Sequence, residues 1–269
     1  MPSNSISYRN VSNFAEGGMA VLYSIVLADG QQAILRELRG RYVFRFKIRA
    51  RFVRGIKIRA ELTPHPNLVN FLSSGSKCFK PYEVIEKIPG ENLKVLINKR
   101  SEATKIHREE ILISAAKGLA FMHQNQYLHL DVKPENFLVD TRDRFHPIVK
   151  LTDFDLACSL DQARRSRQVG TPAYMAPEQF VQKISLKASD VFAFGILAYQ
   201  LCCGRFPFSG NSERQTLRNQ ADENVKPRPL SDFVRDISPR LERVILRSLA
   251  KRVQDRYPDM TAFLHDLAF

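Results

Sequence analysis

The segment HLDVKPENFLV places three different polar side chains close together along the chain. Asp131, Lys133 and Asn136 fall within six residues, and Pro134 disfavours a continuous helix through them, so we expect an ordered loop. A carboxylate, an ammonium and an amide presented together suit phosphoryl transfer. The carboxylate can orient a hydroxyl and accept its proton, the ammonium can neutralise charge on the moving phosphoryl group, and the amide oxygen can bind Mg²⁺.

Two further carboxylates follow in the segment VKLTDFDLA, where Asp153 and Asp155 flank Phe154. The apolar residues before them predict the end of a short strand. A pair of carboxylates at a strand end fits a solvated turn, a metal site or an acid–base pair. Mg²⁺ usually takes only one or two carboxylates together with phosphates and water, so Asp153 with Asn136 is a sufficient protein ligand set.

The elements that must position these side chains change character along the chain. The first part is rich in strands, which are predicted at 21–27, 33–38, 69–73 and 82–86, with a hairpin turn at 28–31. Pro89-Gly90 marks a break, and helices are predicted beyond it at 108–123, 191–201, 241–249 and 260–267. We therefore expect a β-rich part, residues 1–88, followed by a larger helical part, residues 89–269.

Length and composition are those of an ordinary globular protein. With 269 residues, of which 44% are hydrophobic and 26% charged, the chain can bury a sizeable core. No apolar run approaches the roughly 18 residues that span a bilayer, and the N-terminus lacks the apolar core of a signal peptide. The four cysteines show neither metal spacing nor a disulfide framework, which favours reduced thiols and a cytoplasmic location. Because the chain ends soon after the last predicted helix, we expect no regulatory or membrane domain.

A basic segment interrupts the predicted strands. Residues 36–59 contain ten Lys or Arg side chains and one acid, Glu37, in a chain of net charge +13. Apolar residues recur every four positions within it, at Phe44, Ile48, Phe52 and Ile56. This spacing predicts a basic amphipathic helix, whole or broken, with an apolar stripe for packing. Its charged face is either a solvated surface or a patch for an acidic partner, an anionic lipid surface or nucleic acid.

In chain order, the motifs resemble those of the eukaryotic-type serine/threonine protein kinase family. The resemblance rests on HLDVKPENFLV, LTDFD and GTPAYMAPE, with SDVFAFGILAYQL and RYPDM further on, and extends from about Tyr8 to the C-terminus. It implies an α+β, bilobal fold with a small β-rich N-lobe and a larger helical C-lobe, which together form one protein kinase domain, residues 8–269. It also implies ATP and Mg²⁺ as cofactors and a protein as the substrate.

The resemblance implies a role for each matching residue. Asp131 would be the catalytic base, and Lys133 would meet the γ-phosphate of ATP. Asn136 and Asp153 would hold Mg²⁺. The nucleotide would be contacted by residues of the first part of the chain, namely Gly17, Gly18, Leu22, Ile34, Arg36, Glu86 and Ile88.

Other residues would support this machinery. Ile85 would close the back of the nucleotide pocket, and residues 86–88 would form the hinge against adenine. Thr171 would support the catalytic loop, and Asp190 would brace it from below. Glu178 would form an ion pair with Arg256.

Four departures from the family pattern concern nucleotide positioning. The phosphate-covering loop contains AEGGMA, with only the middle glycine of G-x-G-x-x-G in place. Arg36 replaces a phosphate-binding lysine, which keeps the charge on a longer and planar group. Gly55 replaces the helix glutamate that pairs with that lysine, and Glu61 could substitute only if the helix shifts. Asp155 replaces a glycine, either as a surface residue or as an extra metal ligand or a residue that freezes the turn.

Leu130 stands where many family members have an arginine before the catalytic aspartate. A phosphate on the activation segment, residues 153–178, would then lack its usual cationic receiver. We therefore expect activity that does not depend on phosphorylation of this segment, for example at Ser166.

These residues support different functions. The complete set of catalytic-loop and metal residues favours a serine/threonine protein kinase that transfers the γ-phosphate of ATP to a protein hydroxyl. Arg36, Gly55 and Asp155 instead favour a pseudokinase that acts as a binding or scaffold module. A small-molecule phosphotransferase of similar fold fits less well, because GTPAYMAPE resembles the segment that shapes a peptide platform in the family.

Overall fold

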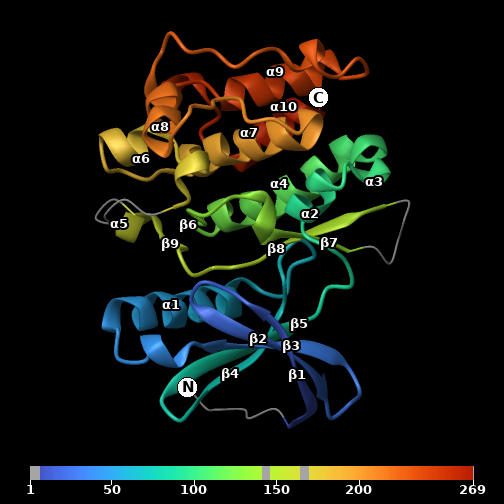
Figure 1. Cartoon of the computed structure of the whole chain (residues 1–269), viewed down its shortest axis with the longest axis vertical. Coiled ribbons are helices and arrows are strands. Elements are labelled where there is room, and N and C mark those ends of the chain that lie inside the picture. The colour runs from blue at the N-terminus through green and yellow to red at the C-terminus, as the bar shows by residue number, and fades with distance from the viewer. Residues whose placement is uncertain (1–6, 141–145, 164–169, 269) are drawn as a thin grey trace.

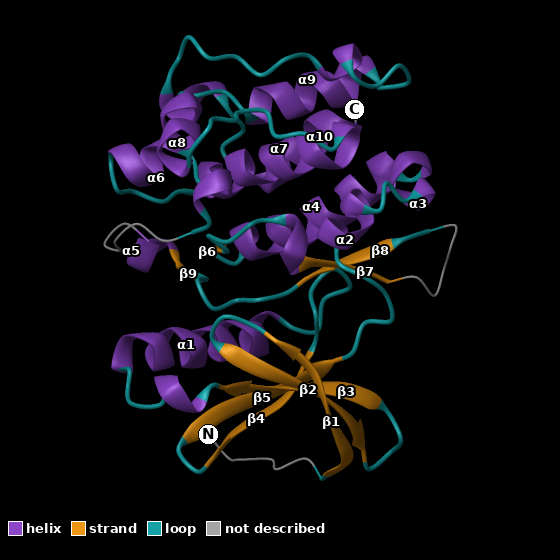
Figure 2. Cartoon of the chain, in the orientation of Figure 1, coloured by secondary structure: helices purple, strands orange, loops and turns teal. Residues whose placement is uncertain are grey.

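The structure, a computed structural model, describes residues 7–140, 146–163 and 170–268. A twisted sheet and one long helix form one end of the molecule, and a larger group of helices forms the other (Figure 1). Figure 2 shows that most strands belong to the first part and most helices to the second. This is the α+β arrangement that the sequence predicts.

The first part is an antiparallel sheet with the strand order β1-β2-β3-β5-β4. Its strands are β1 (Tyr8–Glu16), β2 (Ala20–Leu27), β3 (Gln32–Leu38), β4 (Phe71–Lys77) and β5 (Lys80–Glu86). The β2–β3 hairpin turns at Gly30, whose φ of 87° favours a residue without a Cβ. In the register between β3 and β5, Arg36 lies directly opposite Glu83, so two buried charged residues are neighbours in the sheet.

One helix covers a face of this sheet. The short 3-10 turn η1 (Gly40–Tyr42) leads into helix α1 (Phe46–Leu62). Phe52 and Ile56 of α1 are buried in a cluster with Ala20 and Leu38 of the strands, and Ile48 packs against the same cluster. The apolar stripe therefore fixes α1 to the sheet, as its spacing predicts.

The basic helix predicted over residues 36–59 is only partly correct. Arg36 lies within β3, and α1 begins ten residues later at Phe46. Phe44 lies before the helix and is 83% exposed, so it does not belong to the packing stripe. The four-residue spacing continues by coincidence into a segment that is not helical.

The second part contains a buried central helix surrounded by others. Helix α7 (Lys187–Cys203) is buried along nearly its whole length, which is why its sequence is apolar on all sides. It contacts α4 (Arg108–Gln124), α9 (Pro239–Ser248) and α10 (Met260–Ala268). The remaining helices are α2 (Leu93–Asn98), α3 (Glu102–Ile106), α5 (Leu160–Ala163), α6 (Pro177–Val181) and α8 (Glu213–Ala221). The four predicted helices of this part are confirmed as α4, α7, α9 and α10.

Two short strand pairs lie between the parts and frame the loops that carry chemistry. Strand β6 (Tyr127–Leu128) pairs with β9 (Cys158–Ser159), and β7 (Phe137–Asp140) pairs with β8 (Ile148–Leu151). Residues 129–136, which end in the 3-10 turn η2 (Pro134–Asn136), connect β6 to β7. Residues 152–157 connect β8 to β9, so each loop runs between the same two strand pairs. No described helix is long and apolar enough to cross a membrane.

Candidate active site

Buried Asp190 of α7 fixes the start of the loop at residues 129–136. Its carboxylate oxygens accept hydrogen bonds from the His129 N–H at 2.8 Å and from the Leu130 N–H at 2.9 Å. His123 of α4 lies 3.1 Å from the same carboxylate. Burial opposes ionisation of Asp190, but the hydrogen bond with His123 and the nearby imidazoles outweigh it, so the pKa of Asp190 is lowered. Asp190 therefore braces this loop as an anion.

His129 connects the two loops. Its Nδ1 accepts a hydrogen bond from the Asp131 N–H at 3.3 Å, so its Nε2 carries the proton and donates to the Thr152 carbonyl at 3.0 Å. The ring also packs edge-on against Phe154, with 5.7 Å between ring centres. The position of Asp131 is therefore tied to the position of residues 152–154.

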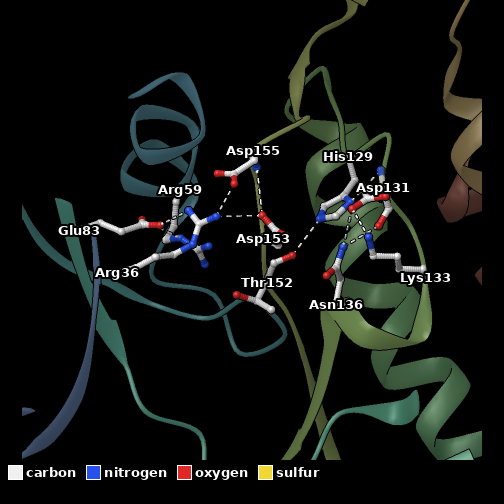
Figure 3. A network of polar contacts seen from close by, with 10 residues as sticks. All are labelled: Arg36, Arg59, Glu83, His129, Asp131, Lys133, Asn136, Thr152, Asp153 and Asp155. Carbon is white, nitrogen blue, oxygen red and sulfur yellow. Dashed lines mark hydrogen bonds and ion pairs between the residues drawn. The ribbon is translucent and has the colours of Figure 1, made fainter. Parts of the chain in front are cut away.

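Three side chains hold the Asp131 carboxylate, and Figure 3 shows two of them, Lys133 and Asn136. The Lys133 Nζ lies 2.6 Å from Oδ2, the Thr171 hydroxyl donates to Oδ1 at 2.7 Å, and the Asn136 amide donates to Oδ2 at 3.2 Å. Lys133 also donates to the Thr171 hydroxyl at 3.2 Å. The loop thus brings together the carboxylate, ammonium and amide that the sequence predicts to act together.

Asn136 and Asp153 have the oxygen donors that a magnesium ion prefers. The Asn136 amide nitrogen donates to the Asp131 carbonyl at 2.8 Å and to the Asp131 carboxylate at 3.2 Å, and the Asn136 amide oxygen is the candidate ligand atom. The Thr152 N–H donates to the Asn136 carbonyl at 2.9 Å, which holds Asp153 beside the loop. The two residues therefore fit a divalent cation, and Asp153 contacts Arg36 in this structure.

Three carboxylates surround Arg36 of β3 (Figure 3). Its Nη1 donates to Glu83 at 3.0 Å, and its Nη2 donates to Asp153 at 3.2 Å and also to Asp155. Burial opposes the charged form of the guanidinium, but the nearby carboxylates outweigh it and raise the pKa of Arg36. Arg36 therefore joins the sheet of the first part to the loop at residues 152–157.

Asp155 is buried, with 4% of its surface exposed, so its interpretation as a surface residue is wrong. Burial raises its pKa to about 6 in spite of the neighbouring guanidinium of Arg36. The positive φ of this turn, 59°, lies at Asp153. Position 155 therefore does not need glycine, and its carboxylate is a partner of Arg36.

Sequence reasoning did not single out two charged residues that complete this network. Glu83 of β5 is 1% exposed and Arg59 of α1 is fully buried. The Arg59 Nε donates to Glu83 at 3.1 Å and its Nη1 donates to the Val69 carbonyl at 3.1 Å. Its guanidinium also lies 4.4 Å from the centre of the Phe154 ring. The available signal was that Glu83 directly precedes the apolar pair Val84-Ile85 in a predicted strand.

Gly55 lies where α1 comes closest to the loop at residues 152–157. A Cβ at this position would be 2.7 Å from the Phe154 carbonyl oxygen and 3.2 Å from the Asp155 nitrogen. Glu61, at the end of the same helix, accepts a hydrogen bond from the Tyr127 hydroxyl at 2.8 Å. Glu61 is therefore not the partner of Arg36, and the close approach of the backbone explains the glycine.

An apolar cluster lies between the sheet and β7. Ile34, Ile85 and Ile88 are buried in it, and Leu22 packs against it. Leu138 of β7, which the sequence reasoning did not single out, packs against it from the second part. The structure thus gathers the apolar members of the predicted nucleotide set.

The other members of the predicted nucleotide set, apart from Arg36, are two glycines and Glu86. Gly17 and Gly18 form the turn between β1 and β2, where the Gly17 N–H donates to the Ala20 carbonyl at 2.9 Å. Glu86, at the end of β5, accepts hydrogen bonds from Lys150 at 2.6 Å and from the Asn70 N–H at 2.7 Å. The carboxylate of Glu86 therefore binds the protein itself, and its backbone is the candidate contact for adenine.

The ion pair predicted between Glu178 and Arg256 is confirmed. The guanidinium meets both carboxylate oxygens at 2.9 Å, and both side chains are buried. The Ser189 hydroxyl donates to the same carboxylate at 2.6 Å. Ser166, which lies in the expected activation segment, is outside the described residues.

The fold and the site define a class of protein. One loop presents aspartate, lysine and asparagine, and a second loop beside it carries another aspartate. Both loops face a sheet that contains a buried cation. This arrangement is typical of ATP-dependent phosphotransferases. Residues 8–267 match the protein kinase domain family, so the chain belongs to that family. The fold class predicted from the sequence is thereby confirmed.

Curated relatives of the chain are named as serine/threonine kinases. It is 31% identical to serine/threonine-protein kinase Pkn1 of Myxococcus xanthus, over 97% of this chain and 38% of that protein. It is 29% identical to the probable serine/threonine-protein kinase PknB of Lactococcus lactis, over 97% of this chain and 41% of that protein. The chain thus spans about two fifths of the length of these relatives.

Proposed function

We propose that the chain transfers the γ-phosphate of ATP to a serine or threonine hydroxyl of a protein. The observation that carries this proposal is the Asp131 carboxylate, which Lys133, Thr171 and Asn136 hold in place. Catalysis of phosphoryl transfer depends mainly on positioning and charge stabilisation, and this loop provides groups for both. Membership of the protein kinase family and the names of the relatives support the same function.

We assign the chemical steps to the residues of the two loops. Asp131 orients the substrate hydroxyl and accepts its proton while the oxygen attacks the γ-phosphorus, and the bond from this phosphorus to the β,γ-bridging oxygen breaks so that ADP leaves. Lys133, which lies beside that carboxylate, stabilises negative charge on the moving phosphoryl group. A bound Mg²⁺ would neutralise the phosphates of ATP, and Asn136 and Asp153 are the residues that would hold it.

The nucleotide would occupy the region between the sheet and β7. The apolar cluster that includes Ile34 and Ile88 suits the adenine ring. The turn at Gly17 and Gly18 would cover the phosphates. Arg36 would exchange its contact with Asp153 for a phosphate oxygen, because both are anionic partners for the same Nη2.

Transfer of labelled γ-phosphate from Mg-ATP to a generic serine/threonine substrate tests the proposal. The Asp131→Asn variant keeps the side-chain shape but removes the base, and we expect it to lose activity by about a hundredfold or more. Asp236→Asn is the matched control, because that side chain is 79% exposed. A folded native chain that transfers no more phosphate than Asp131→Asn would reject the proposal and favour a binding or scaffold module.

We also propose the extent and location of the domain. Residues 8–269 would form one kinase domain, with an N-lobe of residues 1–88 and a C-lobe of residues 89–269. The change from sheet to helices after β5 supports this boundary. The four cysteines are free, which supports a reducing, cytoplasmic location.

We propose as well that the start of the basic segment binds an anionic membrane surface. Phe44 and Phe46 are 83% and 82% exposed, and Arg45 lies between them. Arg41 and Lys47 next to them are exposed too. Exposed aromatic rings among cations are typical of segments that lie at a bilayer interface, whereas a merely solvated surface has no need of the rings.

Sedimentation with vesicles tests this surface. We expect the chain to bind vesicles that contain phosphatidylserine and not vesicles of phosphatidylcholine alone, with binding that weakens as salt rises. Replacing Phe44 and Phe46 by serine should reduce binding although the charge is unchanged, whereas Ile106→Ser, at a 72% exposed site on α3, should not. Binding to nucleic acid without binding to either vesicle would contradict the proposal.

A further inference from the structure

The pair formed by Arg36 and Glu83 lies entirely within one sheet. The two residues are directly opposite each other on β3 and β5, and the Arg36 Nη1 donates to Glu83 at 3.0 Å. Neither side chain is more than 9% exposed. A charge-assisted hydrogen bond shielded from water in this way holds one side of the guanidinium in a fixed position.

The opposite side of the guanidinium faces the loop at residues 152–157. The Nη2 of Arg36 meets Asp153 and Asp155 there, and Asp153 is a candidate metal ligand. Because the guanidinium is planar and its donors form a rigid fork, fixing Nη1 also fixes the direction of Nη2. The contact with Glu83 therefore aims the second nitrogen at the place where phosphate would bind.

Helix α1 contributes a cation to this network in place of an acid. Arg59 donates to the second oxygen of Glu83 at 3.1 Å and stacks on Phe154. An acidic side chain at Gly55 would have no room, because even a Cβ there would be 2.7 Å from the Phe154 carbonyl oxygen. Glu61 is occupied by the Tyr127 hydroxyl.

We propose that Glu83 is the positioning residue for Arg36, and that Arg59 links Glu83 to helix α1. This inference rests on the proposed function, since the task of Arg36 is to bind the phosphates of ATP. The pair belongs to two hydrogen-bonded strands, so its formation does not depend on a residue of α1. Arg59 carries the link to the helix, and Gly55, Glu83 and Asp155 together adapt the site to an arginine.

The test compares Glu83→Gln with Glu37→Gln in the full chain. Glu37 is on β3, as Arg36 is, but its carboxylate pairs with the Lys80 ammonium at 3.0 Å and not with Arg36. It is therefore a matched carboxylate outside the site. The readouts are the Kd for Mg-ADP by calorimetry, the KM for ATP, kcat and the unfolding midpoint. We expect Glu83→Gln to weaken Mg-ADP binding and raise the KM for ATP by about tenfold, and Glu37→Gln to change both less than about twofold.

Two further variants separate positioning from folding. Glu83→Met combined with Arg59→Met removes both buried charges at once, so we expect it to fold and still lose nucleotide affinity. Arg59→Met alone keeps the pair of Arg36 and Glu83, and we expect it to retain more nucleotide affinity than Glu83→Gln. A positioning role thus predicts a loss of affinity that does not follow the unfolding midpoint.

Each outcome decides the inference. A folded Glu83→Gln with native affinity and native KM would overturn it, and so would Arg59→Met with the larger loss of affinity. A native chain that binds Mg-ADP but transfers no phosphate would reject only the proposed function, because the affinities still test Glu83. A native chain that binds no Mg-ADP would overturn both.

Discussion

At the scale of residues, two departures from the kinase family pattern, Arg36 and Asp155, belong to one connected set of contacts. Arg36 meets Glu83, Asp153 and Asp155, and Arg59 holds the far side of Glu83. An arginine can serve several carboxylates at once because its donors are spread over a fork, which a lysine does not have. The contacts of this site therefore require the two terminal nitrogens of an arginine.

The first prediction concerns replacing Arg36 by lysine, the residue that the kinase family has at this position. Arg36→Lys should lower kcat/KM for ATP by about tenfold or more, because one ammonium cannot keep the Nη1 and Nη2 contacts together. Steady-state kinetics measure this, with Arg39→Lys as control, since Arg39 makes an exposed ion pair with Glu16 at 2.8 Å. An Arg36→Lys variant that is more active than the native chain would show that Arg36 is a defect.

The sequence predicts well that the candidate catalytic residues lie together, and it predicts this network poorly. Asp131, Lys133 and Asn136 lie within one loop, so their spacing alone indicates their cooperation. Glu83 lies 47 residues from Arg36 along the chain, and only the order of strands β3 and β5 brings the two together. The sequence leaves several interpretations of Asp155 open. The burial of its side chain decides among them, and this burial depends on how α1 packs.

At the scale of elements, helix α1 is fastened to the second part of the molecule. The Arg54 Nε donates to the Ala157 carbonyl at 2.9 Å, Arg59 stacks on Phe154, and Glu61 accepts from Tyr127. The contacts of Arg54 and Arg59 hold α1 against the loop at residues 152–157, so the helix and this loop should keep a fixed relation.

The second prediction concerns whether the substitution Gly55→Ala raises or lowers the free energy of unfolding. Alanine in a helix interior is ordinarily favoured over glycine by roughly 1 kcal/mol. Here the Cβ would approach the Phe154 carbonyl oxygen to 2.7 Å, so Gly55→Ala should instead destabilise the fold by about 1–3 kcal/mol and reduce activity. Denaturant unfolding measures the change.

Gly40→Ala is the control for this prediction, because the nearest atom to a Cβ there is 3.8 Å away. It should leave the unfolding free energy nearly unchanged. A stabilised Gly55→Ala variant would mean that α1 does not press against the loop.

At the scale of the whole molecule, buried ion pairs act in both parts. The network around Arg36 joins the sheet to the loop at residues 152–157, and the pair of Glu178 and Arg256 joins α6 to the segment before α10. The latter pair has side-chain exposures of 2% and 0%. Removing one member of such a pair leaves an uncompensated charge in the interior, which costs far more than losing an exposed pair.

The third prediction compares two neighbouring arginines. Arg256→Ala should lower the free energy of unfolding by about 3–5 kcal/mol, because Glu178 would remain buried without its partner. Arg252→Ala removes an exposed pair with Glu223 at 2.7 Å and should change stability little. Urea titrations of both variants give the comparison, and equal effects would contradict the assigned difference in burial.

We propose above that the site around Arg36, with Glu83 and Asp155 as its partners, binds Mg-ATP. The most direct test is calorimetric titration of Mg-ATP into the native chain and into Arg36→Met, with the fold of each checked by its unfolding midpoint. We expect saturable, magnesium-dependent binding by the native chain and a Kd weakened by about tenfold or more in Arg36→Met. Absence of binding by the native chain, or equal affinity in the folded variant, would contradict it.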